Sequence, residues 1–418
     1  MGGLSRQADK PAVKPALRVA AALLFLVVPQ TVAAQDLIEA PDTDTARVRV
    51  GALYLKPTVA LTNLGIDTNV FNEPESGNPQ SDFTFTFTPA VEMYLRMGRT
   101  WLIGTIREDL VWFQEFEDQR SVNDRYGAAW LAPLTRVNFS VGGTFLDTRE
   151  RPGYEIDTRA QRADTGLHAA AELRTYSKTL LGVRATHKTV AFADDQFYEG
   201  TNLETALNRT ETVIAGTFRH ELTPLTSLTV DFARQNDRFD SNPSRDADST
   251  RIDGGVRFNR FALVTGSAQA GYRDFNPLSP DIPGYSGLVL SASLSYVALG
   301  STKLGFGASR DIQYSYDDDT PYYLQTGIEA TIAQQIYGPV DVEARVGSRR
   351  LAYEDRLVGE VDVENRVDQV RNYGGGIGYR TSQDLRIAFT AEKTHRRSEI
   401  DERQYDDLRY GVTITYGL

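Results

Sequence analysis

Apolar and polar residues alternate at every second position in short segments along most of the chain. The clearest example is residues 83–88, which read Phe-Thr-Phe-Thr-Phe-Thr, and residues 288–296 and 385–389 repeat the pattern. A period of two places the apolar side chains on one face of a β-strand and the polar side chains on the other. About eighteen such segments, each about ten residues long, follow one another from residue 48 onward. They predict an all-β fold.

The links between these segments alternate in length. Short links such as 97–100 and 132–135 are followed by long polar links such as 147–161 and 190–208. Eight short and nine long links would join eighteen strands and place both termini of the chain on the short-link side. This alternation is typical of outer-membrane barrels, which have short periplasmic turns and long extracellular loops.

Contact with lipid requires such a sheet to close. An unpaired backbone group in hydrocarbon costs several kcal/mol, so a spanning sheet can have no free edge. We therefore predict a single closed antiparallel transmembrane β-barrel of about 18 strands over residues 48–418, preceded by a short periplasmic segment at 35–47. The predicted location is the outer membrane of a Gram-negative envelope.

The first residues have the features of a secretory signal peptide. Four basic residues within positions 6–18 precede the apolar run 19–28, and Val32-Ala33-Ala34 offers the small side chains that a signal peptidase requires. We expect residues 1–34 to be removed after Ala34. The apolar run is too short to cross a hydrocarbon core of about 30 Å as a helix.

The last residues form a separate signal. Apolar side chains occupy every second position up to the final residue, at Tyr410, Val412, Ile414, Tyr416 and Leu418. This run resembles the C-terminal strand by which outer-membrane barrels are delivered to their insertion machinery, although Leu418 stands where an aromatic residue is usual. We therefore expect outer-membrane lipid and the barrel-insertion machinery as partners.

The polar side of the segments carries charges of both signs. We predict that the pore-lining residues are Glu92, Arg96, Arg107, Asp109, Arg125, His168, Glu172, Arg184, Lys188, Arg219, Asp231, Arg251, Asp253, Arg257, Arg273, Glu329, Asp341, Glu343, Arg345, Arg386, Glu392 and Arg409. These side chains either pair across strands and brace a hydrated wall, or they form opposed rows that orient solutes at a constriction. Because neither sign dominates, strong ion selectivity is not predicted.

Composition removes several alternatives. The 418 residues include no Cys, which excludes disulfides, Cys-ligated metals and Cys nucleophiles. The net charge of -11 disfavours nucleic acid as a partner. Asp317-Asp318-Asp319 lacks the alternating ligand spacing of a calcium loop, so no metal and no cofactor are expected.

Aromatic residues near strand ends, including Tyr54, Trp101 and Trp130, fit the interfacial girdles of such barrels.

The first predicted hairpin carries a family resemblance. Its motifs are Lys56-Pro57-Thr58-Val59, the run 65–71 (Gly-Ile-Asp-Thr-Asn-Val-Phe), Ser81-Asp82 and Thr88-Pro89-Ala90-Val91. They resemble the opening of the putative β-barrel porin 2 family, which spans nearly the whole mature chain, although Ile66 replaces the usual aromatic residue. The resemblance implies an outer-membrane barrel, and members are often associated with secretion systems for exopolysaccharide or capsule. It implies no catalytic residues.

These observations predict a non-enzymatic protein. We expect a passive porin-like conduit associated with exopolysaccharide or capsule export, with polysaccharide or components of its export system as further partners. A general diffusion porin for small polar nutrients is the alternative. A hydrolase at the barrel rim that uses His168 or His395 as its base is a remote alternative, because a lone His in a strand is usually structural.

Overall fold

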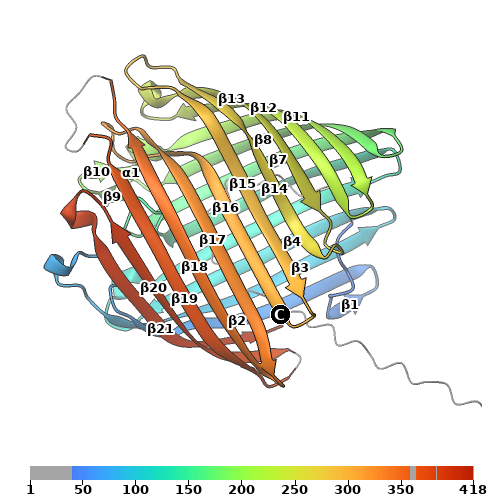
Figure 1. The fold of residues 1–418 in the computed structure, drawn as a ribbon, viewed down its shortest axis with the longest axis horizontal. Helices are drawn as coiled ribbons and strands as arrows, with labels where there is room; N and C mark the ends of the chain where they lie inside the picture. The colour runs from blue at the N-terminus through green and yellow to red at the C-terminus, as the bar shows by residue number, and fades with distance from the viewer. Residues whose placement is uncertain (1–39, 358–363, 383, 418) are drawn as a thin grey trace, which may run out of the picture.

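The computed structural model describes residues 40–417, except residues 358–363 and 383 (Figure 1). The expected signal peptide 1–34 and Leu418 of the predicted insertion signal lie outside the described residues. Helix is nearly absent from the described part of the chain: α1 (Leu203–Leu207) is a single turn, and four 3₁₀ turns lie in loops. None of these helices is long and apolar enough to cross a membrane.

Eighteen antiparallel strands form the wall in the described part of the chain, and each pairs with the next along the sequence. They are β2 (Leu53–Asp67), β3 (Asp82–Met97), β4 (Thr100–Phe113), β5 (Ser121–Pro133), β6 (Val137–Glu150), β7 (Ala160–Tyr176), β8 (Thr179–Phe192), β11 (Arg209–Thr223), β12 (Thr226–Phe239), β13 (Ala247–Phe258), β14 (Val264–Pro277), β15 (Tyr285–Ala298), β16 (Thr302–Tyr314), β17 (Tyr322–Tyr337), β18 (Val340–Glu354), β19 (Val367–Arg380), β20 (Leu385–Arg397) and β21 (Tyr405–Tyr416). β21 pairs back onto β2, so the sheet closes. The predicted fold class is confirmed.

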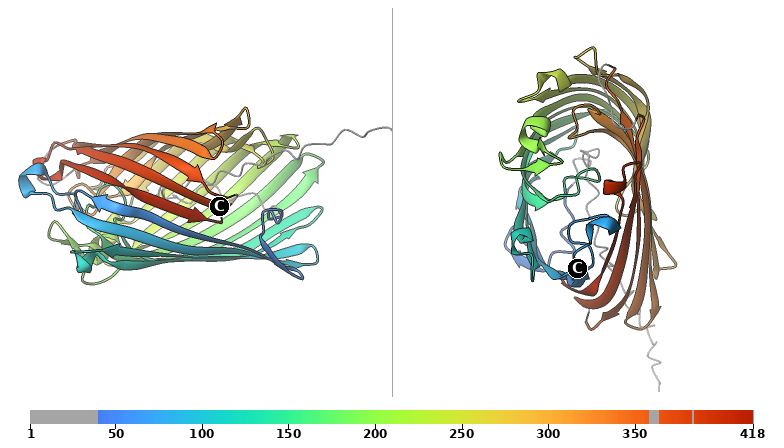
Figure 2. Two further views of the ribbon diagram at one scale, coloured as in Figure 1. Left: turned by 90° about the horizontal axis from the view of Figure 1, so that it is seen from below. Right: turned by 90° about the vertical axis from the view of Figure 1, so that its left-hand side faces the viewer.

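Three short strands lie outside the wall. β1 (Val48–Val50) pairs only with the start of β2. β9 (Phe197–Tyr198) and β10 (Thr201–Asn202) form a small hairpin within the loop between β8 and β11. The barrel is flattened, and Figure 2 shows its long loops gathered at one end.

The two faces of the wall differ as the alternating pattern predicts. Val183 is 65% exposed and Ile377 63% exposed on the outer face, whereas charged residues such as Arg219 are buried inside. Trp130 faces outward. The prediction that Tyr54 and Trp101 belong to the interfacial girdles is wrong, because both side chains lie on the polar, inner side of their strands.

These two aromatic residues form part of the inner face near the short-turn end. The rings of Tyr54 and Trp101 lie 6.2 Å apart. Arg96, which pairs with Trp101 in the register, places its guanidinium 5.7 Å from the Trp101 ring centroid. The Trp101 ring therefore contacts a lumen cation, and neither ring faces the lipid interface.

The closing seam between β2 and β21 brings two glycines face to face. Gly65 pairs with Gly411, just beyond a bulge between Leu61 and Leu64. A Cβ on Gly65 would lie 2.0 Å from the carbonyl oxygen of Tyr410, and one on Gly411 would lie 2.6 Å from the Leu64 carbonyl oxygen. The strands can approach this closely only because neither residue has a side chain.

The upper part of β16 leaves the wall at the long-loop end. β15 pairs with β14 from Tyr285 onward, but with β16 only from Leu290 onward. Tyr314, near the end of β16, packs edge-on against Phe239 with ring centroids 4.9 Å apart. Its hydroxyl donates to Asp237 Oδ2 at 2.7 Å. Because Phe239 and Asp237 lie on the inner face of β12, the end of β16 leans into the lumen.

Candidate functional site

The inner face of the barrel is the candidate site. The structure places every one of the predicted pore-lining residues on the inner face of its strand. Along β20, for example, Arg386 and Glu392 face inward, whereas Ile387 and Phe389 face outward. That these residues line a path for solutes stays a prediction.

Many of these charges pair with a strand two places away. Arg219 of β11 lies 2.6 Å from Glu172 of β7, across β8. Arg345 of β18 lies 2.7 Å from Glu392 of β20, across β19. Each pair bridges the intervening strand and stiffens the wall, as the first interpretation of the charged lumen expected.

A second group of pairs holds the inward-leaning part of β16. Asp311 accepts hydrogen bonds from Arg251 of β13 at 2.9 Å and from Arg273 of β14 at 2.7 Å. Arg251 also lies 2.5 Å from Asp253. One carboxylate of β16 is therefore shared by two arginines on strands that β16 does not pair with.

The remaining predicted residues divide into paired and unpaired positions. The paired positions are Arg107 with Asp109 at 3.0 Å, Lys188 with Asp164 at 3.4 Å, Arg349 with Glu329 at 3.1 Å, Arg386 with Asp341 at 2.6 Å and with Glu343 at 3.3 Å, Arg409 with Asp67 at 3.0 Å, Lys56 with Glu92 at 3.9 Å, and Thr217 with Asp231 at 2.7 Å. Within the described ranges, Arg125 and Arg184 form no ion pair. Arg96 on the inner face of β3 likewise forms no ion pair in the described ranges.

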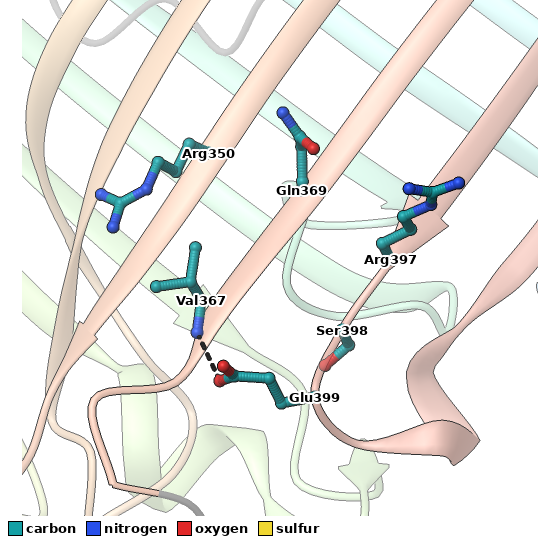
Figure 3. Close-up of a pocket in the computed structure, with 6 residues that line it drawn as sticks. All are labelled: Arg350, Val367, Gln369, Arg397, Ser398 and Glu399. Carbon is teal, nitrogen blue, oxygen red and sulfur yellow. Dashed lines mark hydrogen bonds between the residues drawn. The ribbon is translucent and has the colours of Figure 1, made fainter.

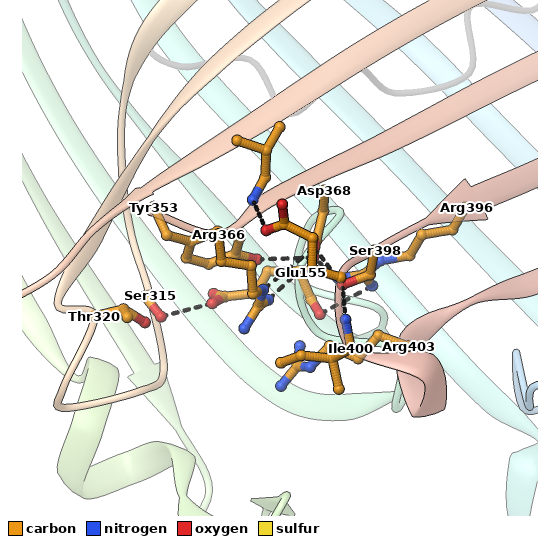
Figure 4. Close-up of polar contacts among 12 residues, drawn as sticks. Glu155, Ser315, Thr320, Tyr353, Arg366, Asp368, Arg396, Ser398, Ile400 and Arg403 are labelled. Carbon is orange, nitrogen blue, oxygen red and sulfur yellow. Dashed lines mark hydrogen bonds and ion pairs between the residues drawn. The ribbon is translucent and has the colours of Figure 1, made fainter. Parts of the chain in front are cut away.

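Two long loops and two strands meet inside the barrel at the long-loop end (Figure 4). Arg396 of β20 lies at the centre: Nη1 is 2.6 Å from Asp157 Oδ2, and Nη2 is 2.6 Å from Asp368 Oδ2. The side chains of Arg396 and Asp368 have no solvent exposure. We refer to Glu155, Asp157, Tyr316, Asp368 and Arg396 as the inner loop cluster.

Glu155 joins the loop 151–159 to the loop 315–321. Its carboxylate accepts hydrogen bonds from Ser315 Oγ at 2.6 Å and from the Tyr316 backbone N–H at 3.3 Å. Burial raises the pKa of Glu155 to about 7, and this effect outweighs the attraction of Arg403, Arg366 and Arg396. The carboxyl group is therefore poised to gain or lose a proton near neutral pH.

Apolar side chains pack beside the cluster. Ile156 of the loop 151–159 contacts a group that contains α1 and the ends of β7 and β8: Ala160, Val190, Phe192, Leu203, Ala206, Leu207 and Tyr316. Asn202 caps α1 by accepting from the Thr205 backbone N–H at 3.1 Å. Burial of each large apolar side chain contributes about 1.5–3 kcal/mol to stability. This packing therefore holds the loops against the inner wall.

Arg245 fixes the loop 240–246 to its neighbours. Its guanidinium donates to the carbonyl oxygens of Ala206 at 2.9 Å, Pro321 at 2.6 Å and Ser315. Burial lowers the pKa of Arg245 to about 10. The side chain remains a cation at neutral pH and connects three separate loops.

Sequence reasoning missed the inner loop cluster. Arg396 could have been found, because it shares the inner-face parity of Arg386 and Glu392 on the same strand. Glu155 and Asp157 lie in a polar loop that has no periodic pattern. The single available signal was the large apolar residue Ile156 in that loop, which would be unfavourable in solvent.

A closed barrel with an apolar outer face, a charged inner face, short turns at one end and long loops at the other defines the class of outer-membrane, porin-like β-barrels. The family model described as putative beta-barrel porin 2 matches residues 40–417, and the chain belongs to this family. The fold, the family and the predicted outer-membrane location agree.

Several solved structures are similar to this chain. A BenF-like porin from Pseudomonas fluorescens has 11% sequence identity and a TM-score of 0.48, and the match covers 87% of this chain and 98% of that one. OpdK from Pseudomonas aeruginosa, solved with vanillate, has 10% identity and a TM-score of 0.44, with coverage of 87% and 98%. OccK2 from Pseudomonas aeruginosa, in complex with glucuronate, has 9% identity and a TM-score of 0.44, with coverage of 87% and 97%. No curated protein matches the chain.

Proposed function

We propose that the protein is a passive outer-membrane channel for small polar solutes, with a lumen that the inward-folded loops narrow. The observation that carries the proposal is the combination of a charged inner wall with a loop cluster that joins facing parts of that wall. A barrel of eighteen strands is wide enough to leave an aqueous channel unless its interior is occupied. Docked loops restrict such a channel to small solutes.

The charges support weak selectivity. Most lumen carboxylates have an arginine or lysine partner, so the wall carries few uncompensated charges of either sign. Among the described residues of the inner face, Arg96, Arg125 and Arg184 are exceptions that form no ion pair. We expect a slight preference for anions and ready passage of neutral polar molecules.

Export of exopolysaccharide or capsule is the second proposal, and it rests on the family resemblance alone. A polymer would need the inner loop cluster to open, because Arg396 and Asp157 lie across its path. The hydrolase alternative gains no support from His395, which lies on the outer face beside Asp406, with Nδ1 3.1 Å from Oδ1.

Purified protein in planar bilayers and liposomes tests these proposals. We expect small, stable ion currents and liposome swelling with glucose but not with maltohexaose. Replacing residues 152–158 by a flexible Gly-Ser linker should increase the current and admit larger sugars. A barrel that conducts neither ions nor sugars, with or without this loop, would contradict the channel proposal. Swelling at equal rates with glucose and maltohexaose would favour the polymer conduit.

A further inference from the structure

The outer face of the wall carries a group of cations where β18, β19 and β20 approach the long-loop end. Arg350 pairs in register with Gln369, and Gln369 pairs with Arg397. Arg371 and His395 form the next row, and Lys393 lies in the row below. Because side chains directly opposite one another share a face, all of these residues point outward.

Three of these residues line a pocket of about 310 Å³ on this face (Figure 3). Its lining residues are Arg350, Val367, Gln369, Arg397, Ser398 and Glu399. The sticks in Figure 3 show Arg350 and Arg397 on either side of Gln369. Two guanidinium groups and one amide therefore border a single depression in the wall.

The cations of this pocket are poorly neutralised. In the part of the chain that the structure describes, Arg350 forms no ion pair, and Arg397 donates Nε to His395 Nε2 at 3.0 Å. The one carboxylate in the pocket, Glu399, accepts from the Val367 backbone N–H at 3.1 Å. Glu399 partly offsets the positive charge of the two arginines, but it forms an ion pair with neither.

Another pair of outer-face arginines shows the contrast. Arg234 and Arg238 of β12 occupy the same end of the wall, but both face Asp248 of β13, at 3.6 Å and 2.7 Å. The cations of β12 are thus satisfied within the protein. Those of β18 and β20 are available to a ligand from outside.

The pocket lies directly above the lipid-facing belt. Farther down β19 and β20, the large apolar residues of the outer face include Tyr373, Ile377 and Phe389, which are 48%, 63% and 56% exposed. The change from apolar to basic residues marks the level of lipid headgroups. Long loops of outer-membrane barrels face the cell exterior, so these cations face the outer leaflet.

We propose that the pocket between Arg350 and Arg397 binds a phosphate group of a phosphorylated glycolipid in the outer leaflet. Guanidinium groups match phosphate oxygens in charge and geometry. Gln369 adds an amide donor between the two arginines, and Arg371 and Lys393 extend the positive surface toward a second phosphate on the same headgroup. The glycolipid acyl chains would lie along the apolar residues below. The proposal is independent of transport through the lumen.

Binding of bisphosphorylated lipid A to the purified barrel in neutral detergent, followed by native mass spectrometry, tests the proposal. The probes are this lipid, lipid A without its phosphates, and inorganic phosphate. We expect the double variant R350Q/R397Q to weaken lipid A binding about tenfold or more, since each basic residue near a lipid surface contributes measurably. E399Q should strengthen binding, because it removes the one negative charge of the pocket.

The matched control is R234Q/R238Q, which should change the affinity less than about twofold. Folding of each variant is checked by its heat-modifiable mobility in electrophoresis, and the single variants R350Q and R397Q replace the double variant if it does not fold. Equal binding of phosphorylated and dephosphorylated lipid A would overturn the proposal, as would unchanged binding by the arginine variants. Inorganic phosphate that binds as tightly as the glycolipid would also overturn it, because the pocket would then be a free-anion site.

Discussion

Arg396 and Asp157 form a buried ion pair between chain segments 239 residues apart, with 2.6 Å between Nη1 and Oδ2. Arg396 belongs to β20, and Asp157 belongs to the loop between β6 and β7. Figure 2 shows these parts of the wall facing each other across the flattened barrel. The pair therefore attaches a loop from one side of the lumen to a strand on the other.

Replacing Arg396 by Gln should release this loop. The substitution leaves Asp157 without its cation, whereas Asp368 keeps Arg366 at 3.0 Å. Loss of one partner of a buried ion pair typically costs about 3–5 kcal/mol. We expect trypsin to cut the folded variant after Arg159 faster than it cuts the native protein. Arg397→Gln is the control, because the neighbouring side chain faces outward. Equal cleavage of the two variants would mean that the ion pair does not hold the loop.

Docking of the loop 151–159 should depend on pH through Glu155. The pKa of about 7 in the docked loop lies above the ordinary value of 4.5, so the docked form holds the proton more tightly. The stabilisation is therefore complete below about pH 4.5 and is lost as the pH rises through about 7, on the order of a few kcal/mol.

Hydrogen–deuterium exchange of residues 151–159, corrected for the intrinsic effect of pH on exchange, measures this change. Exchange should quicken between about pH 5 and pH 8 in the native protein. It should be independent of pH in Glu155→Gln, whose side chain cannot ionise. Glu75→Gln, at an exposed position of another loop, should keep the native profile. A pH dependence that survives in Glu155→Gln would assign the effect to another group.

Closure of the barrel should be sensitive to a single methyl group at Gly65. The methyl of Gly65→Ala would lie 2.0 Å from the Tyr410 carbonyl oxygen, so β2 and β21 must separate locally. Overpacking of this kind costs about 1–3 kcal/mol or more. Gly216→Ala on β11 is the matched control, since nothing lies within 4 Å of its added Cβ. The urea concentration at which heat-modifiable mobility is lost should fall for the first variant and stay unchanged for the second.

A cation in the outer belt should oppose insertion. Val230 of β12 faces lipid and is 44% exposed, and arginine near the midplane of such a barrel costs about 2–4 kcal/mol. Val230→Arg should therefore lower the folded fraction in lipid vesicles. Thr229→Lys, one residue away on the inner face, should fold normally. Equal folding of the two variants would contradict the assignment of Val230 to the outer face and Thr229 to the inner face.

The wall of the barrel was predictable because its chemistry repeats. Period-two alternation separates lipid-facing from lumen-facing residues, and the unequal links identify the two ends. The same parity rule would have placed Tyr54 and Trp101 correctly, since both share a side with lumen charges. Assigning them by residue type alone led to the wrong face.

The inner loop cluster was not predictable by these rules. Glu155 and Asp157 are ordinary loop residues until β20 supplies Arg396 from the facing wall, and no local pattern encodes that approach. The departure of β16 from β15 depends on packing of Tyr314 against β12, which is likewise a tertiary effect. The outer pocket needed the register between β18, β19 and β20, because Arg350 and Arg397 are distant in sequence.

The seam between β2 and β21 has a consequence for biogenesis. Leu408 donates its backbone N–H to Thr68 Oγ1 across a separation of 340 residues. β2 is synthesised before the other strands of the wall, so it can pair with β21 only after the whole chain has been made. During that interval the β2 edge would present bare amide and carbonyl groups to the surrounding bilayer. Pairing of β2 with β21 removes this exposed edge, so the last strand completes the barrel as a lipid-compatible cylinder.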